Sequence, residues 1–311
     1  MWPLILTTVG VVLVLWMIRR WVAGAVCQSK AKLDGKMVII TGANTGIGKE
    51  TAIDLAKRNA RVILACRSQE KGKKAEVDVR RESGNNDVHF RQLDLSSFTS
   101  IRKFAKEVLE EESCVDILIN NAAVGVCPYM KTEDGFETQF GVNHLGHFLL
   151  TNLLLDKIKQ APEGRIVNVS SIAHTLCGPL DLDTINSEEK YSSFGAYNKS
   201  KLANVLFTKQ LAKRLEGTNV TTNCLHPGGV DTELQRHLMI LLIMKFLCGW
   251  LVLKTVKQGA QTSIHLAVSE DVKEISGEYF SDCKLTAPSK HALDEEAAEN
   301  LWKRSEEWTK L

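Results

Sequence analysis

The sequence predicts an α/β fold in which a doubly wound parallel sheet forms one domain behind a short apolar N-terminal helix. Three observations predict it. From residue 36 onward, short apolar runs alternate with segments whose apolar residues have helical spacing. A glycine-rich turn follows the first of these runs, and residues 2–18 contain no charged side chain. The composition, 44% hydrophobic and 24% charged over 311 residues, is that of a globular protein large enough for one such domain.

The N-terminal apolar stretch is long enough for a membrane anchor. Residues 2–18 would span roughly 25 Å as a helix, and Arg19 and Arg20 follow them. A cleaved signal peptide carries its basic residues before the apolar run, although Ala23-Gly24-Ala25 resembles a cleavage site and keeps that alternative open. We therefore predict a membrane anchor in residues 1–26, with its basic side in the cytoplasm.

Glycosylation sequons give a second indication of the side of the membrane. They occur at Asn168, Asn198 and Asn219, and the first two fall within a predicted strand and a predicted helix. A glycan does not fit there. We therefore expect the domain formed by residues 36–311 to face the cytosol.

The alternating elements of this domain follow from local patterns. A continuous apolar run at Met37–Ile40 predicts a strand covered on both faces. Further strands are predicted at Arg61–Ala65, Val88–Leu93, Ile117–Asn120, Ile166–Ser170 and Val220–Leu225. Helical spacing predicts helices around residues 51–56 and at Lys71–Ser83, Phe98–Glu112, Gly135–Lys159 and Ala196–Glu216. Such alternation requires right-handed crossovers and a parallel sheet.

Charge and cysteine content exclude several classes of protein. The net charge is +2, so no large basic surface indicates nucleic-acid binding. The eight cysteines show no spacing typical of zinc sites, and we expect free thiols in a reducing compartment.

The glycine-rich turn lies between the first strand and the first helix. Glycines let the backbone approach a pyrophosphate, and a helix N-terminus offers free N–H groups to it. Glycines also punctuate ordinary loops, but this position favours a nucleotide. No Lys-Ser/Thr pair follows the last glycine, which excludes a Walker-type phosphate loop. The predicted cofactor-binding residues of the turn are Gly42, Ala43, Asn44, Thr45, Gly46, Ile47 and Gly48.

The end of the second strand predicts which dinucleotide binds. An acidic residue there would bind the ribose 2′-hydroxyl of NAD, but this chain has Cys66 followed by Arg67. The Arg67 guanidinium could pair with a 2′-phosphate, which favours NADP(H). The alternative is that Arg67 is a solvated surface charge.

A second group of polar residues lies in the middle of the chain. Tyr197 and Lys201 are four residues apart on a predicted helix, so both project from one face. A nearby ammonium favours the phenolate, and we expect it to lower the tyrosine pKa toward neutrality. Ser170 and Ser171 end a strand, where open α/β sheets bind their ligands. A packed tyrosine beside a surface lysine is the alternative for this pair alone.

Together these motifs resemble the short-chain dehydrogenase/reductase family, which has a Rossmann-type fold. The resemblance spans residues 36 to about 285 and rests on the segment 41–48, Asn120-Asn121-Ala122, Asn143, Ser171 and the Tyr197/Lys201 pair. Within the family the sequence is similar to the membrane-anchored retinol/retinaldehyde dehydrogenases, through the segments 65–67, 169–174, 200–204, 226–228 and 277–283.

The resemblance implies a catalytic role for four residues. Tyr197 would be the general acid/base and Lys201 its partner, which also touches the nicotinamide ribose. Ser171 would orient the substrate oxygen, and Asn143 would hold a water that links Lys201 to solvent.

It also implies further cofactor contacts. Asp94 would contact the adenine end, Asn121 would border the cofactor, and Pro227, Gly228 and Thr232 would lie over the nicotinamide. The chain departs from the family pattern twice, at Ala123 and around Gly229, and the second departure leaves the role of Thr232 less certain.

The function implied is the NADP(H)-dependent interconversion of retinaldehyde and retinol, in the reducing direction. Sterol ketones, other lipid aldehydes and a non-catalytic dinucleotide-binding scaffold stay open as alternatives. We expect an apolar substrate lid over residues 233–257, since residues 238–253 carry only one charge, Lys245. A second membrane helix or a buried helix there is not excluded. The expected membrane is the endoplasmic reticulum, and a homodimer is left open.

Overall fold

The structure is a computed structural model that describes residues 2–231, 249 and 251–311. For residues 2–9 and 11 it describes the backbone but not the side chains. Thr232 and most of the predicted lid over residues 233–257 therefore lie outside the described residues.

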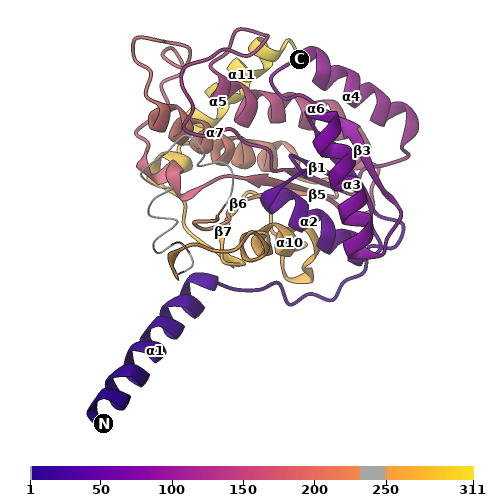
Figure 1. The fold of residues 1–311 in the computed structure, drawn as a ribbon. Helices are drawn as coiled ribbons and strands as arrows, with labels where there is room; N and C mark the ends of the chain where they lie inside the picture. The colour runs from indigo at the N-terminus through magenta and orange to yellow at the C-terminus, as the bar shows by residue number, and fades with distance from the viewer. Residues whose placement is uncertain (1, 232–248, 250) are drawn as a thin grey trace.

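The N-terminal helix projects from the domain and contacts it near its own C-terminal end, through Arg19. Helix α1 (Trp2–Ala23) points away from the domain, and residues 24–36 lead to the first strand (Figure 1). Among the helices that the described residues form, none meets the length and apolarity needed to cross a membrane. The N-terminal anchor therefore stays a prediction.

The domain is built on one sheet with the strand order β3-β2-β1-β4-β5-β6-β7-β8. All neighbouring strands are parallel except β7 and β8. The strands are β1 (Met37–Thr41), β2 (Arg61–Cys66), β3 (Val88–Gln92), β4 (Ile117–Asn120), β5 (Gly164–Val169), β6 (Val220–His226), β7 (Tyr279–Ser281) and β8 (Lys284–Leu285). The order reverses at β1, so the ligand crevice of such a sheet is expected between the carboxyl ends of β1 and β4.

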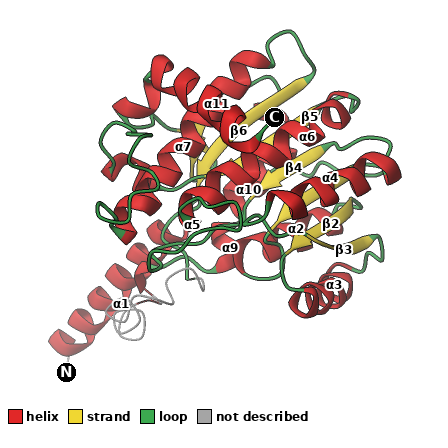
Figure 2. Cartoon of the chain, turned by 90° about the horizontal axis from the view of Figure 1, so that it is seen from above, coloured by secondary structure: helices red, strands yellow, loops and turns green. Residues whose placement is uncertain are grey.

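Helices cover both faces of the sheet, which explains why β1, β4 and β5 are buried along their whole length. One core cluster joins the sheet to α2 (Gly46–Lys57), α3 (Gln69–Ser83) and α10 (Gln261–Val268). A second joins it to α4 (Phe98–Glu111), α6 (Gly146–Lys159), α7 (Ser193–Arg214) and α11 (Glu295–Thr309). Figure 2 shows the strands as one central layer between these helices. The predicted doubly wound parallel sheet is confirmed.

Short elements connect these layers. They are α5 (Thr138–Phe140), α9 (Val256–Gly259), the π-helical turn η1 (Gly141–Leu145) and the 3₁₀ helices η2 (Ile172–Leu176), η4 (Glu270–Val272) and η5 (Lys290–Leu293).

The prediction of one helix over Gly135–Lys159 was wrong. Gly135 has a φ of +85°, so the chain turns there, and the Glu137 carboxylate caps α5 by accepting from the backbone N–H groups of Gln139 and Phe140. The π-helical turn η1 then precedes α6. Apolar spacing continues through all three elements, which is why the sequence pattern did not separate them.

Candidate active site

The glycine-rich turn packs tightly against β4. Gly42 and Gly46 have φ values of +67° and +58°, a region that favours glycine. A Cβ on Gly48 would lie 2.5 Å from the Asn121 side-chain nitrogen and 2.7 Å from the Gly42 carbonyl oxygen. The turn therefore leaves no room for side chains at these positions, and its backbone forms the surface.

The start of α2 has the donors that a pyrophosphate needs. Thr45 precedes the helix in extended conformation, and its side chain makes no capping hydrogen bond. The N–H groups of the first helical turn have no partner within a helix, and the helix dipole favours an anion there. This arrangement fits a dinucleotide pyrophosphate.

Thr41, at the end of β1, ties the turn to the neighbouring strand. Its Oγ1 accepts from the backbone N–H groups of Asn121 and Ala122, at 2.9 Å each. The Asn121 side chain in turn donates to the Thr41 carbonyl at 2.8 Å. Asn121 thus borders the turn that is predicted to bind the cofactor, and its own contact with the cofactor stays a prediction.

His147, which sequence reasoning missed, completes this network. It is buried, and burial lowers its pKa to about 4, so the ring is neutral. Its Nδ1 lies 3.0 Å from the Asn143 carbonyl, which can only accept. Nε2 must therefore accept from the Thr41 hydroxyl at 2.8 Å. A single histidine inside a helix carries no local signal of this role.

The end of β2 lies beside the glycine-rich turn. The Cys66 thiol interacts with the backbone of Ala43 and Asn44, and burial raises its pKa to about 12. Arg67 is the next residue and is exposed. Its guanidinium is thus free to reach a ligand on the turn. Asp94 is half-buried, and one of its carboxylate oxygens accepts from the backbone N–H and hydroxyl of Ser96 at 2.9 and 2.7 Å.

Tyr197, Lys201 and Ser171 are brought together at the carboxyl end of β5. Ser171 follows this strand, and its hydroxyl is hydrogen-bonded to the Tyr197 side chain. The Lys201 Nζ lies 5.6 Å from the centre of the Tyr197 ring and donates to the Val169 carbonyl at 3.0 Å. The predicted triad is thus one cluster.

The expected lowering of the tyrosine pKa is wrong for the chain by itself. Burial raises the pKa of Tyr197 to about 12, and the hydrogen bond with Ser171 opposes this only in part. Burial also lowers the pKa of Lys201 to about 8, which weakens the positive charge that was expected to stabilise a phenolate.

Both polar atoms of the Asn143 side chain are bound. Its amide exchanges two hydrogen bonds of 2.9 Å with the Val124 backbone and donates to the Ser200 hydroxyl at 2.9 Å. Ser200 lies on α7 between Tyr197 and Lys201. Asn143 therefore braces α7 against the segment after β4, and its two side-chain N–H donors are already used.

Two further histidines, both missed from the sequence, hold the Ser171 loop. The Ser289 N–H donates to His174 Nε2 at 3.0 Å, so the opposite Nδ1–H donates to the Ser171 carbonyl at 2.7 Å. The Ile172 N–H donates to His226 Nδ1 at 3.1 Å. Burial lowers the pKa of His226 to about 4 and keeps this acceptor unprotonated.

The turn after β6 lies at the same edge of the sheet. Gly228 has a φ of +93°, and Pro227 precedes it. The side chain of Lys254 packs against this turn, since a Cβ on Gly228 would lie 2.7 Å from its Cδ. Lys254 is buried although it is charged.

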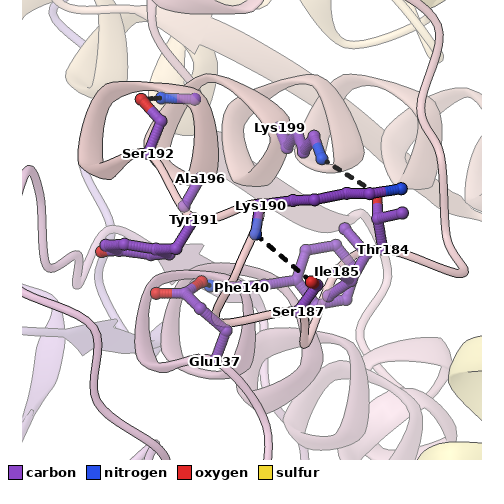
Figure 3. A pocket seen from close by; sticks show the side chains of 11 residues that line it. Glu137, Phe140, Thr184, Ile185, Ser187, Lys190, Tyr191, Ser192, Ala196 and Lys199 are labelled. Carbon is purple, nitrogen blue, oxygen red and sulfur yellow. Dashed lines mark hydrogen bonds between the residues drawn. The ribbon is translucent and has the colours of Figure 1, made fainter.

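A surface pocket near the start of α7 is separate from this cluster. Glu137, Phe140, Ile185, Tyr191 and Lys199 are among the residues that line it (Figure 3). Its polar groups pair with protein atoms, since Tyr191 donates to the Cys127 carbonyl at 2.7 Å and Lys199 donates to the Thr184 hydroxyl at 3.4 Å. No predicted site residue lines it.

The fold, the glycine-rich turn and the Ser171–Tyr197–Lys201 cluster define a dinucleotide-dependent oxidoreductase. The family model for short chain dehydrogenases matches residues 36–239, and the chain belongs to this family. Its cofactor is accordingly a nicotinamide dinucleotide.

Among curated proteins, the chain is 54% identical to human retinol dehydrogenase 12 over 285 residues, which cover 92% of this chain and 90% of that protein. It is 52% identical to human retinol dehydrogenase 13, over 93% of this chain and 89% of that protein. These relatives confirm the resemblance to the retinol dehydrogenase branch.

Solved structures agree on the fold. An uncharacterized protein from Mycobacterium paratuberculosis superimposes with a TM-score of 0.75 at 34% identity, over 92% of this chain and 98% of that one. A short chain dehydrogenase from Escherichia coli CFT073, solved with NADPH, gives a TM-score of 0.66 at 24% identity, over 82% of this chain and 99% of that one.

Proposed function

We propose that this protein is an NADP(H)-dependent oxidoreductase that reduces retinaldehyde to retinol and catalyses the reverse reaction more slowly. The observation that carries the proposal is the hydrogen-bonded Ser171–Tyr197 pair beside Lys201, at the same sheet edge as the glycine-rich turn. The retinoid substrate rests on relatives named retinol dehydrogenases at 50–54% identity.

The catalytic residues act on the substrate oxygen. The bound nicotinamide dinucleotide supplies or accepts a hydride. Tyr197 donates a proton to the aldehyde oxygen, and Ser171 donates a hydrogen bond to the same atom. A Tyr197 pKa of about 12 keeps the phenol protonated at neutral pH, the form that reduction requires. Lys201, whose Nζ lies 5.6 Å from the centre of the Tyr197 ring, would hold the nicotinamide ribose, as the resemblance implies. Asn143 positions α7.

The cofactor is held mainly by backbone groups. The turn of residues 42–48 binds the pyrophosphate through the N–H groups at the start of α2, and Arg67 pairs with the 2′-phosphate of NADP(H). Asp94 binds at the adenine end through its remaining carboxylate oxygen. Pro227 and Gly228 cover the nicotinamide, and Thr232 is proposed on the resemblance alone.

We further propose that residues 1–26 anchor the protein in the endoplasmic reticulum membrane, with the domain of residues 36–311 in the cytosol. The exposed face of α1 is apolar and includes Val12, Leu13, Trp16, Met17 and Trp21. The sequon at Asn168 lies in β5, where the side chain is 1% exposed and donates to Thr208. That position has no room for a lumenal glycan.

Truncation tests the anchor. Deleting residues 1–26 should release the protein from an alkaline-washed membrane fraction, and the full chain should co-localise with an endoplasmic reticulum marker. If the truncated chain stayed with membranes, another segment would be the anchor.

The substrate lid over residues 233–257 stays a proposal from the sequence. Changing Leu242 and Leu247 to Ser should raise the KM for retinaldehyde more than the KM for a short soluble aldehyde. Equal effects on both substrates would contradict a lipophilic entrance. A homodimer is tested by light scattering of the detergent-solubilised protein.

The proposed reaction is tested by NADPH oxidation. The purified full chain in liposomes is assayed with retinaldehyde, a medium-chain aldehyde and a steroid ketone, against NADH as the alternative cofactor. Retinaldehyde with NADPH should give the highest kcat/KM. A higher kcat/KM for the steroid ketone would mean that a sterol ketone, not retinaldehyde, is the preferred substrate. If NADPH bound but was not oxidised with any of the three substrates, the protein would be a non-catalytic scaffold.

A further inference from the structure

Four segments of the chain meet at one buried ion pair next to the Pro227–Gly228 turn. The Lys254 Nζ pairs with the carboxylate of Asp282, which follows β7. Lys254 is 6% exposed and Asp282 keeps about half of its side chain exposed. A lysine this deeply buried is stable only with a charged partner. The pair therefore fixes the position of Lys254.

The backbone of Lys254 is bound to the segment that follows the turn. Its N–H donates to the Gly229 carbonyl at 2.8 Å, and its carbonyl accepts from the Asp231 N–H at 3.0 Å. These bonds form a parallel bridge with Val230. Any displacement of Lys254 thus displaces the backbone next to Gly228.

The linker after α1 passes directly over this pair. Gly24 has a φ of +70°, and a Cβ there would lie 2.7 Å from the Lys254 Nζ and would overlap the Asp282 carboxylate. Glycine at this position therefore allows the N-terminal segment to approach the ion pair closely.

Side chains and backbone of the N-terminal segment hold the residues after Lys254 as well. Arg19 donates to the Leu253 carbonyl at 3.2 Å and to Gln258 Oε1 at 2.9 Å. The same Gln258 oxygen accepts from the Thr255 N–H in the capping box that starts α9. Further along, the Cys27 N–H donates to Gln261 Oε1 at 3.1 Å.

From these contacts we propose that residues 19–27 are a positioning element of the active site, in addition to any role as a tether. Arg19 and Gly24 hold Leu253 and Lys254, and Lys254 supports the Pro227–Gly228 turn. The inference rests on the proposed function for its link to the nicotinamide. These contacts also tie the end of α1, which points away from the domain, to the segment that supports the Pro227–Gly228 turn (Figure 1).

Two matched pairs of variants in the full-length chain test this proposal. Arg19→Gln is compared with Arg20→Gln, which removes the same charge from a side chain that stacks on Trp16 of its own helix. Gly24→Ala is compared with Gly35→Ala, where φ is +72° but a Cβ would meet nothing within 4 Å. The second control carries the same backbone strain without the overlap.

Three quantities are measured in liposomes: the kcat/KM for retinaldehyde, the NADPH affinity by fluorescence titration, and the hydrogen exchange of amides 251–261. Arg19→Gln loses hydrogen bonds to Leu253 and Gln258, and Gly24→Ala adds a Cβ that overlaps the ion pair. Each variant should lose about fivefold or more in kcat/KM and should exchange these amides faster. Arg20→Gln and Gly35→Ala should match the wild type in all three, with the membrane-bound fraction equal throughout.

The proposal is overturned if each variant behaves as its control, or if exchange rises while kcat/KM and NADPH affinity stay constant. In the latter case residues 19–27 bind the segment 251–261 but do not position the active site. If the wild type does not reduce retinaldehyde, the proposed function fails, and the NADPH affinity and exchange of the four variants still decide whether the segment positions the turn.

Discussion

Two halves of the sheet contribute to the site in different ways. The cofactor half, residues 37–92, offers backbone N–H groups and the exposed Arg67. The catalytic half, residues 117–226, offers side chains that are buried and bound to one another, such as Lys201 on Val169 and Asn143 on Ser200. A ligand contact in the cofactor half can be removed without disturbing the fold. In the catalytic half, chemistry and stability depend on the same atoms.

The largest expected effect is in the catalytic half. Tyr197→Phe should lower turnover by about 10²–10⁴-fold, because it removes the proton donor, and should leave NADPH binding nearly unchanged. Steady-state kinetics and fluorescence titration measure both. Tyr191→Phe is the matched control, since its hydroxyl is bonded to Cys127 and Gln139 beside the pocket of Figure 3, which the catalytic cluster does not line. A Tyr197→Phe enzyme with more than about a tenth of normal turnover would contradict the assignment.

The second prediction is that acid pH lowers the free energy of unfolding through buried histidines of the catalytic half. Burial lowers the pKa of His144 to about 3 and those of His147 and His226 to about 4, all below the value of 6.5 in the unfolded chain. Between pH 6.5 and 4 the unfolded chain therefore binds more protons, and the free energy of unfolding falls as the pH falls.

Each of these histidines should contribute about 1 kcal/mol per pH unit in that range. Urea titrations at several pH values measure the slope, and His226→Gln should reduce it. A free energy of unfolding that stays constant from pH 7 to 5 would mean that these rings accept protons inside the fold, contrary to the buried, neutral network described above.

The third prediction breaks a ligand contact in the cofactor half. Arg67→Ala should weaken NADPH binding by about 1.5–3 kcal/mol and NADH binding far less, because only NADPH carries the 2′-phosphate. The free energy of unfolding should not change, since Arg67 is exposed. Equal losses for both cofactors would show that Arg67 does not contact the phosphate.

The two halves also differ in how well the sequence predicts them. The six predicted strands lie within two residues of β1–β6. Met37–Ile40 is the clearest of them, because it is apolar throughout, as a strand buried on both faces requires. The glycine-rich turn could be predicted equally well, since its conformation depends on the glycines of the local sequence. The cofactor half could thus be predicted almost completely.

The catalytic half was predicted only at the residues with a motif. His147, His174 and His226 bind partners 106, 115 and 54 residues away, and no local pattern marks such contacts. The direction of the Tyr197 pKa also depends on burial by distant segments. Spacing on a helix brought Tyr197 and Lys201 together correctly, but it could not show that burial would shift both groups away from their charged forms.

The smallest expected effect comes from removing a helix cap next to Arg67. It tests whether NADPH binding depends on the stability of α3 as well as on the Arg67 contact. Ser68 follows Arg67 and caps α3, its hydroxyl accepting from the Lys71 N–H at 3.3 Å. Ser68→Ala should lower the free energy of unfolding by about 0.5–1 kcal/mol, because it removes a half-exposed helix cap. The NADPH affinity should change less than about twofold.

Ser97→Ala is the matched control for this change, because Ser97 caps α4 with the same 3.3 Å bond to the Ser100 N–H but is 5% exposed. Ser97→Ala should cost more free energy of unfolding than Ser68→Ala, since the half-buried Ser100 N–H is harder for water to reach than the N–H of the exposed Lys71. Thermal unfolding and NADPH titration of both variants measure these effects. If Ser68→Ala weakened NADPH binding as much as Arg67→Ala, the guanidinium would depend on α3 for its position. The cofactor half would then couple binding to folding, as the catalytic half does.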